Sequence, residues 1–313
     1  MSLKYLIGID GGGTNSRLLA CGSDGAVLGH CLGKSTNVES NSVQCVLAHL
    51  QEVLELFLAQ SCCALEDCQG LCLGTAGVDT ERSRMEVNEI VKQLHLPCPT
   101  LVVNDAEIAL AAETKGEPGA LLISGTGSIG YGINREGESC RVGGYGYLVS
   151  DEGSSYWISR KAIGALLREY DRTGNVSGAI FEHICEALNI GKVEQLVDFV
   201  YRSNKAEMAQ LALCVVSAFE EGDPLAEWIM QRAARHLSAM ALALGWRLKM
   251  ANARYPLVFS GSMLTRMPWL MDEVTRLVKA QFPLWDSAPL SREAEWGAVY
   301  LAARHSGVPI QGI

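Results

Sequence analysis

The sequence predicts two α/β domains of similar design, and three observations support this fold class. The chain has 313 residues, which is more than one hydrophobic core usually serves. Short apolar runs alternate with segments of helical periodicity, as in α/β units with parallel strands. An apolar run followed by an interrupted glycine cluster occurs twice, and the two copies align when Ser124 is placed on Asp10: YLIGIDGGGTNSRLL at 5–19 and ALLISGTGSIGYGI at 120–133.

The first domain is expected over residues 1–117, and it begins with three strands separated by Gly-rich or Asp-Gly turns. The apolar runs that predict this strand meander are KYLIGID, SRLLACG and AVLGHCL. Residues 42–60 carry apolar side chains at helical spacing and predict a helix. After it we expect, in order, a strand in GLCLGTAG, a helix over 81–94, a strand in TLVVNDA and a helix over 107–113.

The second domain is expected over residues 118–313, after the boundary segment KGEPG at 115–119. It repeats the three-strand opening, in ALLISG, SIGYGIN and SCRVGG. A helical insertion is expected over about 152–250, and within it Asp223 and Pro224 suit the N-cap and first turn of a long helix. YPLVFSGSM predicts a buried strand. Residues 291–304 predict a final helix, which either completes this domain or packs back on the first.

Composition excludes several classes of protein. The net charge is −9 and Lys and Arg form no long run, which argues against a nucleic-acid partner or an anionic membrane surface. No apolar run has the length of a membrane span, and the first residues do not resemble a signal peptide. The eleven cysteines are an odd number without C-x-x-C spacing, and the six histidines show no ligand spacing. We therefore expect a cytoplasmic protein with reduced thiols and no structural zinc site.

Each glycine turn is a candidate phosphate site, because glycine leaves backbone NH groups open to an anion. Two matched turns, one opening each domain, could hold a nucleotide phosphate chain between them. Asp10 precedes the first turn and adds a carboxylate where a phosphate-bound Mg²⁺ would sit. A single turn of this kind is also explained by the steric needs of a hairpin.

Three further polar segments are candidates for ligand contacts. Asn104 and Asp105 follow an apolar strand, at the end where open α/β sheets bind ligands, although Asp105 could instead cap the next helix. The run GGYGYLVSDEGSSYW at 143–157 frames a tight loop, in which Asp151 could also be an N-cap. Asn37, in KSTNVES, is either a turn residue or a ligand to a polyol.

The segments that carry a family resemblance cover nearly the whole chain: DGGGT at 10–14, STN at 35–37, GTAG at 74–77, NDA at 104–106, ISGTGS at 123–128, GGYG at 143–146, DEGS at 151–154, YW at 156–157 and GDPL at 222–225. In this order they resemble the sugar kinases of the actin, hexokinase and heat-shock ATPase superfamily. The chain is most similar to the N-acetylglucosamine kinase family, with its bacterial glucosamine and muramyl-sugar relatives. The resemblance implies duplicated ribonuclease H-like ATPase domains, with a helical insertion in the second, that bind ATP between them.

The resemblance also implies roles for individual residues. Asp105 looks like the base that accepts the proton of the sugar 6-hydroxyl as it attacks the γ-phosphate, and Asp10 would organise Mg²⁺ through water. The residues implied to bind ATP are Asp10, Gly11, Gly12, Gly13, Thr14, Gly125, Thr126, Gly127, Ala218, Gly261 and Ser262. Those implied to form the sugar pocket are Asn37, Asp105, Ser128, Gly144, Tyr145, Gly146 and Asp151. The implied substrate is an N-acetylated hexosamine, with N-acetylglucosamine first and N-acetylmuramic acid second, and the relatives are often homodimers.

Two departures from the family pattern leave the amino sugar open. Tyr145 stands where many relatives have Trp, and Ile129 follows the SGTGS turn where the animal enzymes have Asn.

Two other functions occur in the same superfamily, namely an ATPase that activates a dehydratase or reductase partner and a non-enzymatic sugar sensor. The activators carry NDKCAAGTG-like and CTVF-like cysteine motifs. The sensors carry a DNA-binding helix–turn–helix and a C-x-C-G-x-x-G-C cluster. This sequence contains none of these patterns, which favours the kinase.

Overall fold

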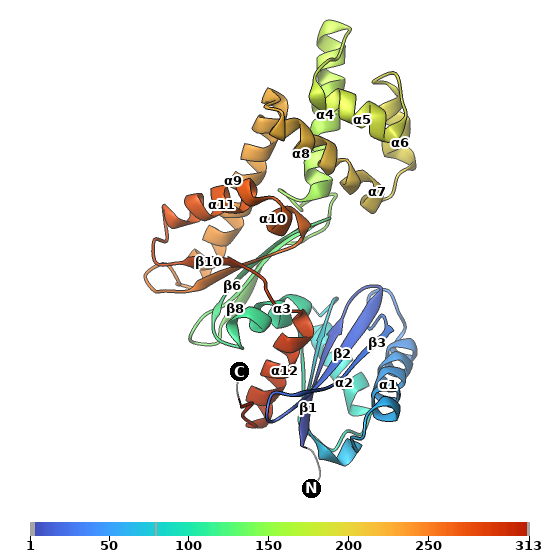
Figure 1. The fold of residues 1–313 in the computed structure, drawn as a ribbon, viewed down its shortest axis with the longest axis vertical. Helices are drawn as coiled ribbons and strands as arrows, with labels where there is room; N and C mark the ends of the chain where they lie inside the picture. The colour runs from blue at the N-terminus through green and yellow to red at the C-terminus, as the bar shows by residue number, and fades with distance from the viewer. Residues whose placement is uncertain (1–3, 79, 312–313) are drawn as a thin grey trace. The chain divides into compact units, whose positions relative to one another are not determined.

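The computed structural model describes residues 4–78 and 80–311, which divide into two compact units (Figure 1). Unit 1 comprises the chain up to Pro118 together with the segment from Leu290 onward, and unit 2 comprises Gly119–Pro289. The last helix of the chain therefore belongs to the unit that the first residues build.

Unit 1 is built on a five-stranded sheet with the order β3-β2-β1-β4-β5. β1, β2 and β3 form an antiparallel meander, whereas β4 and β5 run parallel to β1. The strands are β1 (Tyr5–Gly11), β2 (Asn15–Gly22), β3 (Val27–Lys34), β4 (Cys68–Thr75) and β5 (Thr100–Asn104). The helices are α1 (Val43–Gln60), the short 3₁₀ helix η1 (Leu65–Asp67), α2 (Glu81–Lys92), α3 (Asp105–Thr114) and α12 (Ala294–Ser306). The predicted strands and long helices of this unit are confirmed, with ends shifted by a few residues.

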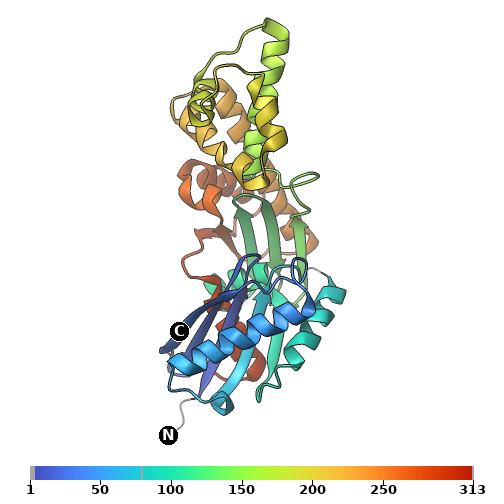
Figure 2. The same cartoon turned by 90° about the vertical axis from the view of Figure 1, so that its right-hand side faces the viewer.

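The two faces of this sheet bury different cores, because successive side chains of a strand point to opposite sides. Ile7 and Ile9 of β1 pack with α1 and α2 on one face, whereas Leu6 packs with α3 and α12 on the other (Figures 1 and 2). Helices α3 and α12 approach so closely that a Cβ on Gly297 would lie 1.8 Å from the carbonyl oxygen of Ile108. This packing holds α12 against β1 and the start of α3.

Unit 2 repeats the same strand order, as β10-β9-β6-β7-β8. β6, β7 and β8 are antiparallel, and β9 and β10 run parallel to β6. The strands are β6 (Gly119–Ser124), β7 (Ser128–Ile133), β8 (Ser139–Gly143), β9 (Pro256–Ser260) and β10 (Asp286–Pro289). The repeat around Asp10 and Ser124 is thus the hairpin between the first two strands of each sheet. β10 was not predicted, because its sequence DSAP contains no apolar run.

The helices of unit 2 include the predicted insertion. They are α4 (Ser155–Thr173), α5 (Ala179–Leu188), α6 (Gln195–Arg202), α7 (Lys205–Gln210), α8 (Ala212–Glu220), α9 (Pro224–Arg247), α10 (Ser262–Arg266) and α11 (Pro268–Lys279). Asp223 caps α9 as predicted, since its Oδ1 accepts from the NH groups of Leu225 and Ala226 at 2.8 and 3.0 Å. α9 packs on β6, β7 and β8, and α4 to α8 gather beyond one end of this sheet (Figures 1 and 2). No helix within residues 4–78 and 80–311 is both long and apolar enough to cross a bilayer.

Candidate active site

In unit 1 the predicted residues gather at the carboxyl ends of three neighbouring parallel strands. The register pairs Asp10 with Gly74 and Gly11 with Thr75 between β1 and β4. Thr75 in turn pairs with Asn104 at the end of β5. Asp10 and the Asn104–Asp105 segment therefore lie at the same edge of the sheet, at the ends of β1 and β5 with β4 between them, where α/β sheets bind ligands.

The turn from Gly12 to Thr14 is packed at its start and open at its centre. A Cβ on Gly11 would lie 1.9 Å from Oγ1 of Thr36, so packing requires glycine there. At Gly13 the nearest atom to such a Cβ is Nδ2 of Asn37, at 4.0 Å. Packing therefore does not explain glycine at position 13, whereas close approach of a ligand to the main chain does.

Asn37 lies beside this turn and also stabilises its own loop. Its Oδ1 accepts from the NH of Glu39 at 2.8 Å, and a Cβ on Gly77 would lie 2.6 Å from this oxygen. Its Nδ2 is the group nearest Gly13. The turn role and the ligand role that the sequence left open are therefore compatible, because they use different atoms of the amide.

Asn104 takes the capping role that the sequence left open for Asp105. It is the N-cap of α3, and its Oδ1 accepts from the NH of Ala106 at 2.8 Å. Asp105 is the first residue of the helix, and its Oδ1 accepts from the same NH at 2.8 Å. The positive end of the helix dipole favours the ionised carboxylate at this position.

Asp10 experiences an unfavourable environment for its charge. Burial is the main cause that raises the pKa of its carboxyl to about 6, and the negative charges of Glu295 and Asp105 raise it further, against the lowering effect of Arg17. Since no group of three or more His, Cys, Asp or Glu side chains in the described part of the chain could hold a metal, a cation here would need ligands besides protein carboxylates.

In unit 2 the two predicted small-residue turns contact each other. Within the first turn, the NH of Gly125 donates to the carbonyl of Gly127 at 2.9 Å, and the carbonyl of Gly125 accepts from the NH of Ser155 at 2.8 Å. Gly261 has a φ of +84°, and a Cβ there would lie 2.3 Å from the carbonyl oxygen of Ser124. Glycine at 261 therefore serves both the backbone conformation and the contact with the turn that follows β6.

A pocket of about 340 Å³ opens beside these turns, and both Thr126 and Ser262 line it. The rest of the lining is mainly apolar and comes from α4, α7, α8, α10 and the residue after α10: Ser155, Ala206, Ala209, Gln210, Ala212, Leu213, Val216, Met263, Arg266 and Met267. Such a lining with a few polar groups suits a flat heteroaromatic ring. Ala218 is fully buried in the core and does not line this pocket, to which α8 contributes Leu213 and Val216.

The other predicted sugar-pocket residues lie in the loop after β8 and around it. Gly144 and Gly146 have φ values of +70° and +92°, which favour glycine. Tyr145 between them is 62% exposed, and the Arg141 guanidinium carbon lies 5.0 Å from its ring centroid. Oγ of Ser128 donates to the carbonyl of Glu152 at 2.8 Å, so this side chain supports the loop.

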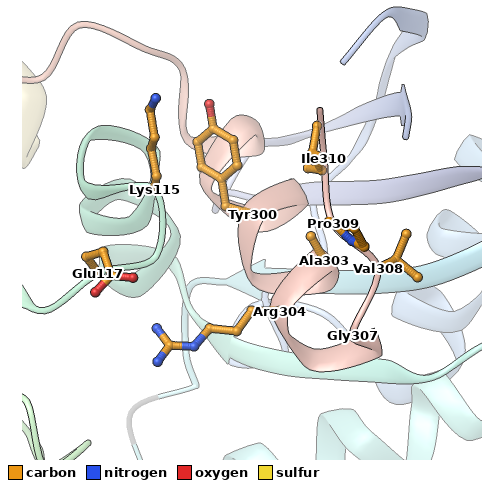
Figure 3. A pocket seen from close by; sticks show the side chains of 9 residues that line it. All are labelled: Lys115, Glu117, Tyr300, Ala303, Arg304, Gly307, Val308, Pro309 and Ile310. Atoms are coloured by element: carbon orange, nitrogen blue, oxygen red, sulfur yellow. The ribbon is translucent and has the colours of Figure 1, made fainter. Parts of the chain in front are cut away.

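A larger hollow, of about 610 Å³, lies elsewhere in unit 1 and contains none of the predicted site residues (Figure 3). It is lined by Lys115, Glu117, Tyr300, Ala303, Arg304, Gly307, Val308, Pro309 and Ile310. Asp105 begins α3 and Lys115 follows its last residue, so about 15 Å of helix separates the two. In this region Nη1 of Arg304 donates to the carbonyl of Gly116 at 2.6 Å. Size alone therefore does not identify the site.

The comparisons with known proteins agree with this arrangement. The sequence profile of the BadF/BadG/BcrA/BcrD ATPase family matches residues 7–285. The chain belongs to this family. Among its relatives, the N-acetylmuramic acid/N-acetylglucosamine kinase of Clostridium acetobutylicum is 35% identical over 303 residues, which cover 96% of this chain and 98% of the relative.

Solved structures confirm the fold predicted for this family member. A candidate N-acetylglucosamine kinase from Chromobacterium violaceum has a TM-score of 0.71 at 23% identity, covering 96% of this chain and all of the other. A ROK hexokinase from Thermus thermophilus has a TM-score of 0.58 at 17% identity, covering 96% and 97%. The fold class and the resemblance to the N-acetylglucosamine kinase family are thus both confirmed.

Two charged residues that interact with predicted site residues were not among the candidates from the sequence. Glu295 of α12 has a 2% exposed side chain, its Oε1 lies 2.9 Å from Nε2 of His30, and its Oε2 has no hydrogen-bond partner in the described residues. Lys205 of α7 pairs with Asp151, and the distance from its Nζ to Oδ2 is 3.0 Å. Neither residue stands in a glycine motif. The only signal in the sequence was that both are charged residues beside apolar ones.

Proposed function

We propose that this protein is an ATP-dependent sugar kinase that phosphorylates the 6-hydroxyl of an N-acetylated hexosamine. N-acetylglucosamine is the first proposed substrate and N-acetylmuramic acid the second. The observation that carries the proposal is the pair of electrostatically coupled carboxylates, Asp10 and Asp105, at the same edge of one sheet, where Asp10 directly precedes an open glycine turn. The C. acetobutylicum relative supports the class of sugar.

Each residue has a specific task in this proposal. Asp105 accepts the proton of the 6-hydroxyl, and the main chain of residues 11–14 binds phosphate oxygens. The turn at 125–127 is the second proposed phosphate site, and the pocket lined by Thr126 and Ser262 takes the adenosine. Positioning and electrostatic stabilisation account for most of the rate of phosphoryl transfer, so these contacts matter as much as the base. The sugar contacts are assigned to Asn37, Ser128, Gly144, Tyr145, Gly146 and Asp151, with Asp105.

The residues around Asp10 fit a Mg²⁺ ion held through water and phosphate. The Asp10 carboxylate is the hard oxygen donor that Mg²⁺ takes, and a nearby cation would offset the burial and the neighbouring negative charges that raise the pKa of Asp10. When bound, Mg²⁺ neutralises charge on the phosphates. Asp10 would orient its water ligands, and Asp105 would remain available to the sugar.

The proposal is tested by a coupled assay of ATP with N-acetylglucosamine, N-acetylmuramic acid, N-acetylmannosamine, glucosamine and glucose. We expect N-acetylglucosamine to be phosphorylated on O6, which ³¹P and ¹³C NMR of the product would establish. Glucose should react far more slowly, because groups that bind the acetamido function would be left unpaired. ATP hydrolysis with no sugar product would contradict the proposal and favour an ATPase activator.

Two glycine substitutions separate binding from packing in the first turn. Gly13→Ala should fold normally, because the nearest atom to its new Cβ lies 4.0 Å away. Its KM for ATP should rise ~10- to 100-fold, since the methyl group would keep phosphate from the charge-assisted NH bonds. Thermal unfolding and the ATP dependence of the initial rate measure the two effects.

Gly11→Ala provides the contrasting control. Its Cβ would meet Thr36 Oγ1 at 1.9 Å, so we expect a lower unfolding temperature whatever the ligand. An unchanged KM in Gly13→Ala would remove the main-chain phosphate site from the proposal.

A further inference from the structure

Lys205 is held in a defined position at the start of α7. Its Nζ lies 3.0 Å from Oδ2 of Asp151 and 5.6 Å from the ring centroid of Tyr147. The Asp151 side chain is only 4% exposed, whereas that of Lys205 is 35% exposed. The carboxylate is therefore fixed and desolvated, while the ammonium group keeps access to solvent.

The ion pair lies directly against the second phosphate turn. A Cβ on Gly127 would come 2.8 Å from Oδ2 of Asp151 and 3.2 Å from Nζ of Lys205. Thr126 and Ala206, the chain neighbours of Gly127 and Lys205, both line the pocket of about 340 Å³. The ammonium group thus lies against Gly127, one residue from the Thr126 that lines the pocket.

A cation beside this turn would help an acidic protein to bind an anionic ligand. A protein with net charge −9 must bind a highly charged triphosphate, and main-chain NH groups and Mg²⁺ supply only part of the compensation. Lysine carries a compact charge on a flexible stem, so its ammonium can move to a nearby oxygen without backbone change. A phosphate at Gly127 would compete with the Asp151 carboxylate for it.

We propose that Lys205 binds the phosphate chain of the nucleotide at the Thr126–Gly127 turn, and that Asp151 holds it there while the nucleotide is absent. Binding then exchanges a carboxylate partner for a phosphate partner. This inference rests on the proposed function for its ligand, ATP, but it does not depend on which sugar is phosphorylated.

The exchange predicts opposite effects for the two members of the pair. Lys205→Met removes the phosphate contact, so the Kd for Mg·ATP should rise ~10- to 100-fold, as for the loss of a charge-assisted hydrogen bond. Asp151→Asn removes the competing carboxylate and a source of repulsion, so the Kd should fall ~3- to 10-fold. Asparagine suits the φ of +64° at this position. A purely structural salt bridge would instead weaken binding in both variants.

The experiment is isothermal titration of the full chain with Mg·ATP and, separately, with adenosine, at two salt concentrations. Lys205→Met should lose affinity for Mg·ATP and keep its affinity for adenosine, which carries no phosphate. Lys205→Met leaves the Asp151 carboxylate buried without its cation, so this single variant could fail to fold. The double variant Lys205→Met with Asp151→Asn removes the unpaired charge and serves as the alternative. The double variant should still bind Mg·ATP more weakly than the wild type, because it lacks the cation. Lys279→Met, which removes an exposed lysine at the end of α11, is the matched control and should match the wild type.

Each outcome bears on the inference separately from the sugar assay. Equal Mg·ATP affinities in the wild type and the double variant overturn it, even if the wild type phosphorylates N-acetylglucosamine. If Lys205→Met binds both Mg·ATP and adenosine more weakly than the wild type, the inference is also overturned, because the loss of affinity would then be structural. If Lys205→Met loses affinity for Mg·ATP but not for adenosine, the inference is supported, even if no sugar on the panel is phosphorylated. A wild type that does not bind Mg·ATP overturns both proposals.

Discussion

Asp105→Asn is expected to lower kcat by ~10²- to 10⁴-fold, because an amide cannot accept the proton of the sugar hydroxyl. The substitution keeps the shape of the side chain, and the helix keeps its Asn104 cap. Binding of both substrates should therefore change little. Initial rates and Kd values for ATP and N-acetylglucosamine, measured on the same preparation, test this separation.

Asp24→Asn is a matched control for Asp105→Asn. Asp24 also lies in unit 1, and its Oδ1 accepts from the NH of Ala26 at 3.0 Å in the turn between β2 and β3. We expect Asp24→Asn to keep kcat within a few-fold of the wild type. If Asp105→Asn did the same, Asp105 would not be the base.

Asp10→Asn should have opposite effects on activity and on stability. A carboxylate that orients the water ligands of Mg²⁺ acts on the metal from outside its first shell, and loss of such a group costs ~10- to 100-fold in activity. The same variant should unfold at a higher temperature without nucleotide. In the wild type the folded state must carry the Asp10 charge in a buried position beside Glu295 and Asp105.

The sign of the pH dependence follows from the raised pKa. The folded protein binds the Asp10 proton more tightly than the unfolded chain does, since the pKa rises from 3.8 to about 6. The contribution of Asp10 to the free energy of unfolding therefore decreases as pH rises through this window, and it stays low above about pH 6. At ~1.4 kcal/mol per pKa unit the full effect is at most ~3 kcal/mol.

Thermal unfolding at pH 5 and pH 8, in buffer without divalent cations, measures this effect. The stability advantage of Asp10→Asn over the wild type should be larger at pH 8 than at pH 5. Saturating Mg·ATP should reduce or reverse the advantage, because only the wild type gains the full binding energy. If the stability difference between Asp10→Asn and the wild type does not change with pH, the Asp10 carboxyl does not have the raised pKa.

Much of the fold could be predicted because local patterns and tertiary structure agree. The strands β1 to β9 contain apolar runs or follow glycine turns, and α1 and α9 show their periodicity or their cap in the sequence. The segment from 262 to 289 was not assigned. There α10 has five residues and β10 has four, so neither is long enough to show a period. Helix α11 has twelve residues, and the helical spacing of its buried Leu270, Val274 and Val278 was not recognised.

Several of the predicted site residues stand in glycine motifs or at strand ends. Asp10, Asp105 and the turns at 11–14 and 125–127 are of this kind, and the sheet order places the first two at the ends of β1 and β5, on either side of β4. Ala218 shows the limit of motif transfer, since it is buried while Leu213 and Val216 of the same helix line the pocket. Which face of a helix meets a cavity depends on its packing partners.

The repeated strand–turn–strand design, the positions of the glycine turns and the carboxylates beside them could all be read from the amino-acid sequence. These features are local, because turn geometry and strand ends are set by a few consecutive residues. It took the three-dimensional fold to show that burial and the charge of Glu295 raise the pKa of Asp10, and that Lys205 lies against Gly127. These pairs are far apart in the chain, and their interaction depends on packing that no local pattern encodes.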